Sequence, residues 1–79
     1  MNNYEILVLK RLADTIEVDK KYSINFRSFS EELGISKEDL DKALNSLENA
    51  RFIDQFPLDK LDDFIISLRQ KGFNESQSL

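Results

Sequence analysis

Residues 26–53 are FRSFSEELGISKEDLDKALNSLENARFI, and this segment determines the architecture expected for the chain. Its first part predicts a short helix at about 27–33. Ser28 and Glu31 have the spacing of a capping box, which would move the helix start one or two residues later. Gly34 ends the helix, because glycine adopts the left-handed backbone conformation at the least cost. The segment therefore begins with a short helix and a tight turn.

A second, longer helix is expected after the turn. Ser36 is a good N-cap, and the acids of Lys37-Glu38-Asp39 lie in the first turn, where the helix dipole favours them. Apolar side chains then recur with the helical period and predict one buried stripe: Leu40, Ala43, Leu44 and Leu47. Two helices joined in this way form the helix-turn-helix pattern, which often enters the major groove of DNA.

The N-terminal third predicts a helix and a short strand. Asn2 or Asn3 can cap a helix that runs to about Glu17. The buried stripe of this helix is expected to consist of Leu9, Leu12, Ala13 and Ile16. Apolar and polar side chains alternate over 22–26, as they do in a half-buried strand.

The same N-terminal helix carries a second set of side chains at helical spacing, namely Tyr4, Leu7 and Arg11. Two interpretations are open. Tyr4 and Leu7 pack under a terminal segment of the same chain, or they form an apolar surface for a partner or a second copy.

The C-terminal part also has two interpretations. Residues 52–56 and 64–68 are rich in aromatic and β-branched side chains, which favours a β-hairpin. The alternative is a fourth helix over 57–70, with Pro57 at its first position, which would make the fold all-α with four helices. We favour the hairpin, and we expect one domain over 1–73 followed by a disordered polar tail at 74–79.

The composition narrows the classes of function. The 79 residues include 15 acidic and 11 basic side chains, for a formal net charge of −4, whereas small DNA-binding domains are usually basic. The chain has no histidine and no cysteine, so the commonest general base and the commonest zinc ligands are missing. We therefore expect no enzyme, no metal site and no cofactor.

Membrane insertion and export are also not indicated. The longest apolar run is Ile6-Leu7-Val8-Leu9, whereas a membrane span needs roughly 20 residues. The N-terminus MNNYE lacks the positive charge of a signal peptide. A cytoplasmic protein without a membrane partner is expected.

Three segments resemble a known family: FSEELGIS (Phe29–Ser36), LDKALNSLENARFI (Leu40–Ile53) and FIISLRQKGF (Phe64–Phe73). They are similar to the helix-two-and-turn signature, the recognition helix and the closing strand of the winged helix-turn-helix superfamily. The resemblance covers roughly 4–73 and implies a mainly α fold with a small β-hairpin, the wing. The family often has glycine where this chain has Arg51, so a different end of the longer helix is expected.

The outward face of the longer helix carries the candidate DNA contacts. The side-chain amides of Asn45 and Asn49 can contact adenine, and the ammonium group of Lys42 can contact guanine or phosphate. The resemblance implies backbone contacts from the start of the preceding helix and from the wing. The predicted DNA-binding residues are Arg27, Ser36, Lys37, Lys42, Asn45, Asn49 and Lys60. The alternative interpretation of each of them is a solvated surface side chain.

These observations predict a DNA-binding transcriptional regulator that places its longer helix in the major groove. A dimer is expected, because two-fold pairing extends a small footprint, and its predicted interface is Tyr4, Leu7 and Arg11. The alternative is an acidic protein-binding adaptor or inhibitor on the same fold, of the kind found in phages or mobile elements. That protein would bind a basic protein surface and no DNA, since Glu38 and Asp41 outnumber Lys42 on the outward face.

Overall fold

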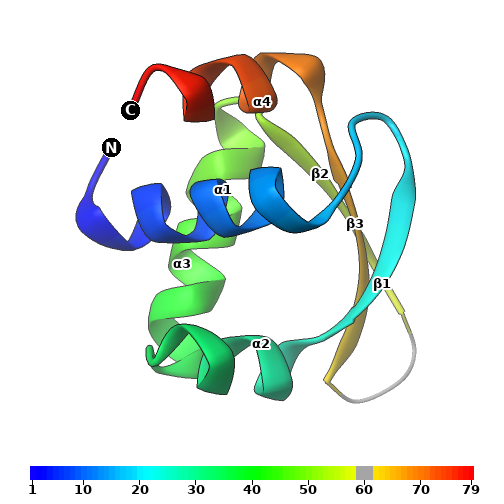
Figure 1. Ribbon diagram of the computed structural model, residues 1–79. Helices are drawn as coiled ribbons and strands as arrows, with labels where there is room; N and C mark the ends of the chain where they lie inside the picture. Colours follow the sequence, from blue (N-terminus) through cyan, green and yellow to red (C-terminus); the bar gives the residue numbers. More distant parts are fainter. Residues whose placement is uncertain (59–61) are drawn as a thin grey trace.

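The computed structural model describes residues 1–58 and 62–79, and within them the chain forms four helices and a three-stranded antiparallel sheet (Figure 1). The predicted mainly helical fold with a hairpin is therefore confirmed at this level. The elements in chain order are α1 (Asn3–Thr15), β1 (Lys21–Asn25), α2 (Phe26–Leu33), α3 (Lys37–Asn49), β2 (Ile53–Pro57), β3 (Asp63–Leu68) and α4 (Gln70–Gln77).

The helix starts follow local side-chain chemistry. Ser36 caps α3 by accepting a hydrogen bond from the Asp39 backbone N–H (3.0 Å), as predicted. Of the two predicted caps of α1, Asn2 is the one used, and it forms a capping box with Glu5. The predicted Ser28–Glu31 capping box is wrong. Asn25 caps α2 instead, so the helix begins directly after β1, at Phe26.

The sheet has the strand order β1–β3–β2, with β3 in the centre. Strands β2 and β3 form the predicted hairpin, in which Ile53 lies opposite Leu68. The alternative of a helix over 57–70 is wrong, because every second side chain of β3 is buried, and this period of two belongs to a strand. The sequence did not indicate that β1 would pair with the other edge of β3.

The core lies between the helices and one face of the sheet. Its fully buried side chains come from α1, α3 and the three-stranded sheet: Val8, Leu9, Leu12, Leu40, Leu44, Leu47, Ile53, Ile66 and Leu68. The Cα radius of gyration is 11.4 Å. A compact domain of this length is expected at about 11.6 Å. Within the described residues, no helix combines the length and the hydropathy that crossing a membrane requires.

The predicted disorder of 74–79 is wrong for residues 74–77, which form the last part of α4. This helix packs on α1 near both chain ends (Figure 1). Phe73 packs against the core, Ser76 is buried, and Gly72 lies against the backbone of Phe52. The segment was predicted to be disordered because its composition is polar, and the sequence did not indicate these few anchoring contacts.

Helix α3 ends in a motif that normally uses glycine. The backbone N–H of Arg51 donates to the Glu48 carbonyl (2.9 Å), and that of Phe52 donates to the Leu47 carbonyl (3.0 Å). This pair of hydrogen bonds is the Schellman arrangement. Arg51 occupies its left-handed position with φ 64°. Arg51 thus adopts the conformation that glycine usually takes, at a cost in backbone strain, and the prediction of a different helix end is wrong.

Replacing this residue is expected to stabilise the protein. Arg51→Gly removes the Cβ that makes the left-handed conformation unfavourable, so the free energy of unfolding should rise by about 0.5–1 kcal/mol. Chemical denaturation measures the change. Arg51→Ala is the matched control, because it also loses the charge but keeps the Cβ and should give no gain. A less stable glycine variant would contradict the strain that we assign to Arg51.

Candidate interaction surface at helix α3

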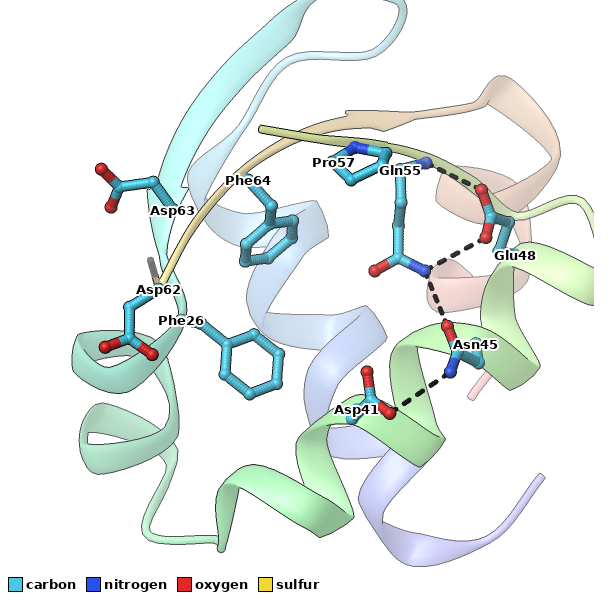
Figure 2. Close-up of a pocket in the computed structure, with 9 residues that line it drawn as sticks. All are labelled: Phe26, Asp41, Asn45, Glu48, Gln55, Pro57, Asp62, Asp63 and Phe64. Atoms are coloured by element: carbon cyan, nitrogen blue, oxygen red, sulfur yellow. Dashed lines mark hydrogen bonds between the residues drawn. The ribbon is translucent and has the colours of Figure 1, made fainter. Parts of the chain in front are cut away.

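A groove with a volume of about 480 Å³ lies between α3 and the β2–β3 hairpin. We call it the α3 groove. The described residues that line it are Phe26, Asp41, Asn45, Glu48, Gln55, Pro57, Asp62, Asp63 and Phe64 (Figure 2). Four of these nine side chains are carboxylates and none is basic.

One wall of the groove is a chain of hydrogen bonds that begins and ends at a carboxylate. The Gln55 side-chain N–H groups donate to Glu48 Oε1 and to Asn45 Oδ1, both at 3.2 Å. The Asn45 side-chain N–H donates in turn to Asp41 Oδ2 (3.5 Å). We call these four side chains the amide ladder. The backbone N–H of Gln55 also donates to Glu48 (3.0 Å), which fastens β2 to α3.

The opposite wall is aromatic. The rings of Phe26 and Phe64 meet edge to face, with 5.8 Å between their centroids and 69° between their planes. Figure 2 places both rings across the opening from the amide ladder, and it shows Asp62 and Asp63 on the side of the rings away from the ladder. The groove thus has an apolar side and a hydrogen-bonding side.

Two of the predicted DNA-binding cations lie beside a carboxylate from the hairpin. Lys37 Nζ donates to Asp62 Oδ1 (2.6 Å), and Arg27 Nε lies 4.0 Å from Asp62 Oδ2. The carbonyl of Asp62 also accepts a hydrogen bond from the backbone N–H of Phe26. One residue therefore connects the starts of α2 and α3 to the hairpin.

The remaining predicted DNA contacts differ in their surroundings. Lys42 lies 3.2 Å from Glu38, one turn earlier on α3. Asn45 belongs to the amide ladder, so its amide oxygen and one amide N–H already have partners. Ser36 is the N-cap, and Asn49 is exposed at the last residue of α3. Lys60, predicted at the wing tip, lies outside the described residues.

The hydrogen bond from Lys37 lowers the pKa of Asp62, and the nearby Arg27 charge adds to this effect. A carboxyl group whose pKa is lower in the folded than in the unfolded state stabilises the fold above its unfolded pKa, about 3.9 for Asp. That stabilisation disappears as the pH falls through the lower, folded value.

Asp62→Asn is expected to make the protein less sensitive to acid. The thermal midpoint of the wild type should fall more steeply than that of the variant between about pH 5 and pH 2. Asparagine suits this position, because Asp62 has φ 66° and asparagine tolerates the left-handed region. Asp14→Asn, on the exposed side of α1, removes the same charge and should follow the wild type. If the thermal midpoints of Asp62→Asn and the wild type fell equally with decreasing pH, the ion pair of Asp62 would not contribute to stability.

The predicted dimer surface is partly apolar and partly used within the chain. Tyr4 is 44% exposed and Leu7 is 37% exposed, so the terminal helix α4 does not cover them. Arg11 pairs with Glu32 of α2. The dimer itself stays a prediction.

Gln55 and Glu48 are contributors to the groove that sequence reasoning did not single out. Asp41, Asn45 and Glu48 have the spacing i, i+4 and i+7, which places them along one side of α3. Gln55 is a polar side chain on the inward face of β2, two residues after the buried Ile53. These two signals together would have indicated a polar wall.

Two further findings concern the composition of this surface and the comparison of the chain with known proteins. No group of three metal-ligating side chains gathers among the described residues. Comparison with models of known families, with curated proteins and with solved structures gives no match for the chain.

Proposed function

We propose that this chain is a winged helix-turn-helix domain that binds a basic protein surface through the α3 groove. The fold part of the proposal is supported by the element order, with α2, the Gly34 turn and α3 followed by the β2–β3 hairpin. The function part is supported mainly by one observation. Each predicted DNA-binding cation of the described surface, Arg27, Lys37 and Lys42, already lies within 4.0 Å of a carboxylate.

Charge on α3 itself favours the same conclusion. Residues 37–49 include two lysines and four acidic side chains, for a formal charge of −2. Affinity for duplex DNA comes largely from cations that neutralise phosphates and release counterions. A helix of this charge would be repelled by phosphates, whereas it would attract a basic protein surface and raise the rate of encounter with it.

DNA binding is the second candidate function, and the exposed position of α3 beside the hairpin favours it. Lys42 is exposed, and Asn49 at the end of the helix is exposed as well. An asparagine can contact adenine, and a glutamate can accept a hydrogen bond from cytosine. This candidate requires the ion pairs of Lys37 and Lys42 to open on binding.

Fluorescence anisotropy separates the two candidates. We expect the protein not to saturate a labelled mixed-sequence duplex of about 20 base pairs in about 50 mM salt, with a Kd weaker than about 10⁻⁴ M. A labelled peptide of alternating lysine and glycine should bind, with an affinity that falls as salt is added. Micromolar duplex binding that is lost in the double variant Lys37→Ala, Lys42→Ala would favour DNA and overturn the proposal.

A further inference from the structure

We propose that the α3 groove binds an arginine side chain of its protein partner, with the guanidinium between the amide ladder and the Phe26–Phe64 pair. This inference rests on the proposed function and specifies which side chain of the basic partner the groove selects. It depends on which hydrogen-bonding groups of the ladder remain available.

The amide ladder uses three of its four amide N–H donors internally and leaves two oxygen acceptors for a ligand. An ionised carboxylate only accepts hydrogen bonds, so Glu48 at one end and Asp41 at the other fix the orientation of both amides. Gln55 then gives both of its amide hydrogens to Glu48 and Asn45, and Asn45 gives one to Asp41. Among the hydrogen bonds of the described residues, none engages Gln55 Oε1 or Asp41 Oδ1.

These two oxygens face the opening of the groove. Figure 2 shows the amide oxygen of Gln55 on the side of the two phenylalanine rings, and the amide nitrogen on the side of Glu48 and Asn45. One oxygen of Asp41 meets Asn45 while the other points into the space between the walls (Figure 2). A ligand that enters here meets two acceptors on one side, and one of them is charged.

The aromatic wall favours a cation that is planar. Phe26 and Phe64 both line the groove and pack edge to face, and an aromatic ring carries partial negative charge on its π face. A cation over such a face gains about 0.5–1 kcal/mol at an exposed site. This wall and the acceptors of the ladder therefore select the same kind of group, a cation with several donors.

Arginine fits this arrangement better than lysine. Its guanidinium carries five N–H donors in a fixed plane, so it can stack on a ring while it donates sideways to Gln55 and Asp41. An ammonium group is a more strongly hydrated point charge and cannot stack in this way. Of the cations in the described part of the chain, Lys37 forms an ion pair with Asp62 on the far side of the rings, and Arg27 Nε lies 4.0 Å from the same carboxylate. They do not compete for the opening.

Titration of the ¹⁵N-labelled protein tests the proposal by NMR. The probe is N-acetyl-arginine amide, and the controls are N-acetyl-lysine amide and N-acetyl-citrulline amide, which has nearly the same shape but no charge. We expect arginine to shift the side-chain amide signals of Gln55 and Asn45 in a saturable way. Lysine should bind more weakly, and citrulline should give no saturable shift.

Two matched variants locate the site. Asp41→Asn should weaken the binding of N-acetyl-arginine amide by about threefold, the scale of one exposed ion pair. Asp14→Asn, which removes the same charge on α1, should leave it unchanged. A spectrum with the wild-type signal dispersion shows that each variant is folded.

The possible results separate this inference from the proposed function. If the lysine-glycine peptide binds at α3 but N-acetyl-arginine amide leaves Gln55 and Asn45 unshifted, arginine selection is wrong and the proposed function stands. Arginine selection would also be wrong if the arginine and citrulline amides bound with equal affinity. The same holds if Asp41→Asn and Asp14→Asn changed the affinity for N-acetyl-arginine amide equally. If neither the peptide nor any amide binds, both proposals are wrong.

Discussion

Leu47→Ala is expected to lower the free energy of unfolding by about 2–4 kcal/mol, because it leaves a cavity at the contact between α3 and the rest of the core. The Leu47 side chain is 1% exposed, and its carbonyl accepts the Phe52 N–H that closes the end of the helix. A domain of this size has a total stability of about 4–12 kcal/mol, so the variant would lose a large part of it. Urea denaturation followed by circular dichroism measures the loss.

Leu7→Ala is the matched control for this prediction. The chemical change is the same, but Leu7 is 37% exposed on α1, so its cost should stay below about 1 kcal/mol in the monomer. Equal costs for the two variants would contradict the position of Leu47 in the core. The inward orientation of the leucine stripe, on which the outward face of α3 depends, would then be wrong as well.

Gly72→Ala is expected to destabilise the protein by about 1–3 kcal/mol, although alanine is the better helix former. A Cβ at this position would lie 2.3 Å from the backbone carbonyl oxygen of Phe52. That carbonyl also accepts the Arg69 N–H at 2.9 Å, which anchors the start of α4. The clash therefore involves backbone on both sides, and α4 would have to move away from the end of α3. The thermal midpoint and urea denaturation measure the effect.

Gly34→Ala distinguishes steric contact from backbone strain. A Cβ at Gly34 would meet nothing within 4 Å, and the residue has φ 71°. Only the left-handed conformation is then unfavourable, which costs about 1 kcal/mol. If Gly72→Ala stabilised the protein instead, as its helix propensity alone would predict, the packing of α4 against Phe52 would be refuted.

Local sequence signals were enough to predict the elements that are stabilised by residues close together in the sequence. The leucine period predicted α3, and the caps at Asn2 and Ser36 marked two helix starts. Helix α4 was missed because its anchors are contacts with residues distant in sequence, above all the approach of Gly72 to Phe52. The start of α2 was misplaced because Asn25 serves as the end of a strand and as a helix cap at once.

The candidate site was also predictable only where it depends on residues close together in the sequence. The outward orientation of Lys42 and Asn49 followed from the helical period, and both side chains are exposed. The partner of Lys37 did not follow, because Asp62 is 25 residues away and reaches it only through the fold of the hairpin. The amide ladder also joins α3 to a strand, so only the paired structure brings Gln55 to Asn45. Lys42 and Asn49 were assigned correctly to the outward face, whereas the pairing of Lys37 with Asp62 required the tertiary structure.

The most direct measurement compares two ligands on the same backbone signals. ¹⁵N-labelled protein is titrated in about 20 mM salt, where electrostatic attraction is strongest, with unlabelled duplex DNA and separately with the lysine-glycine peptide. We predict that the peptide shifts the signals of α3 and the β2–β3 hairpin and that the duplex leaves them in place. Saturable shifts along Lys37–Asn49 caused by the duplex, with none caused by the peptide, would contradict the assignment of this surface to a basic protein partner.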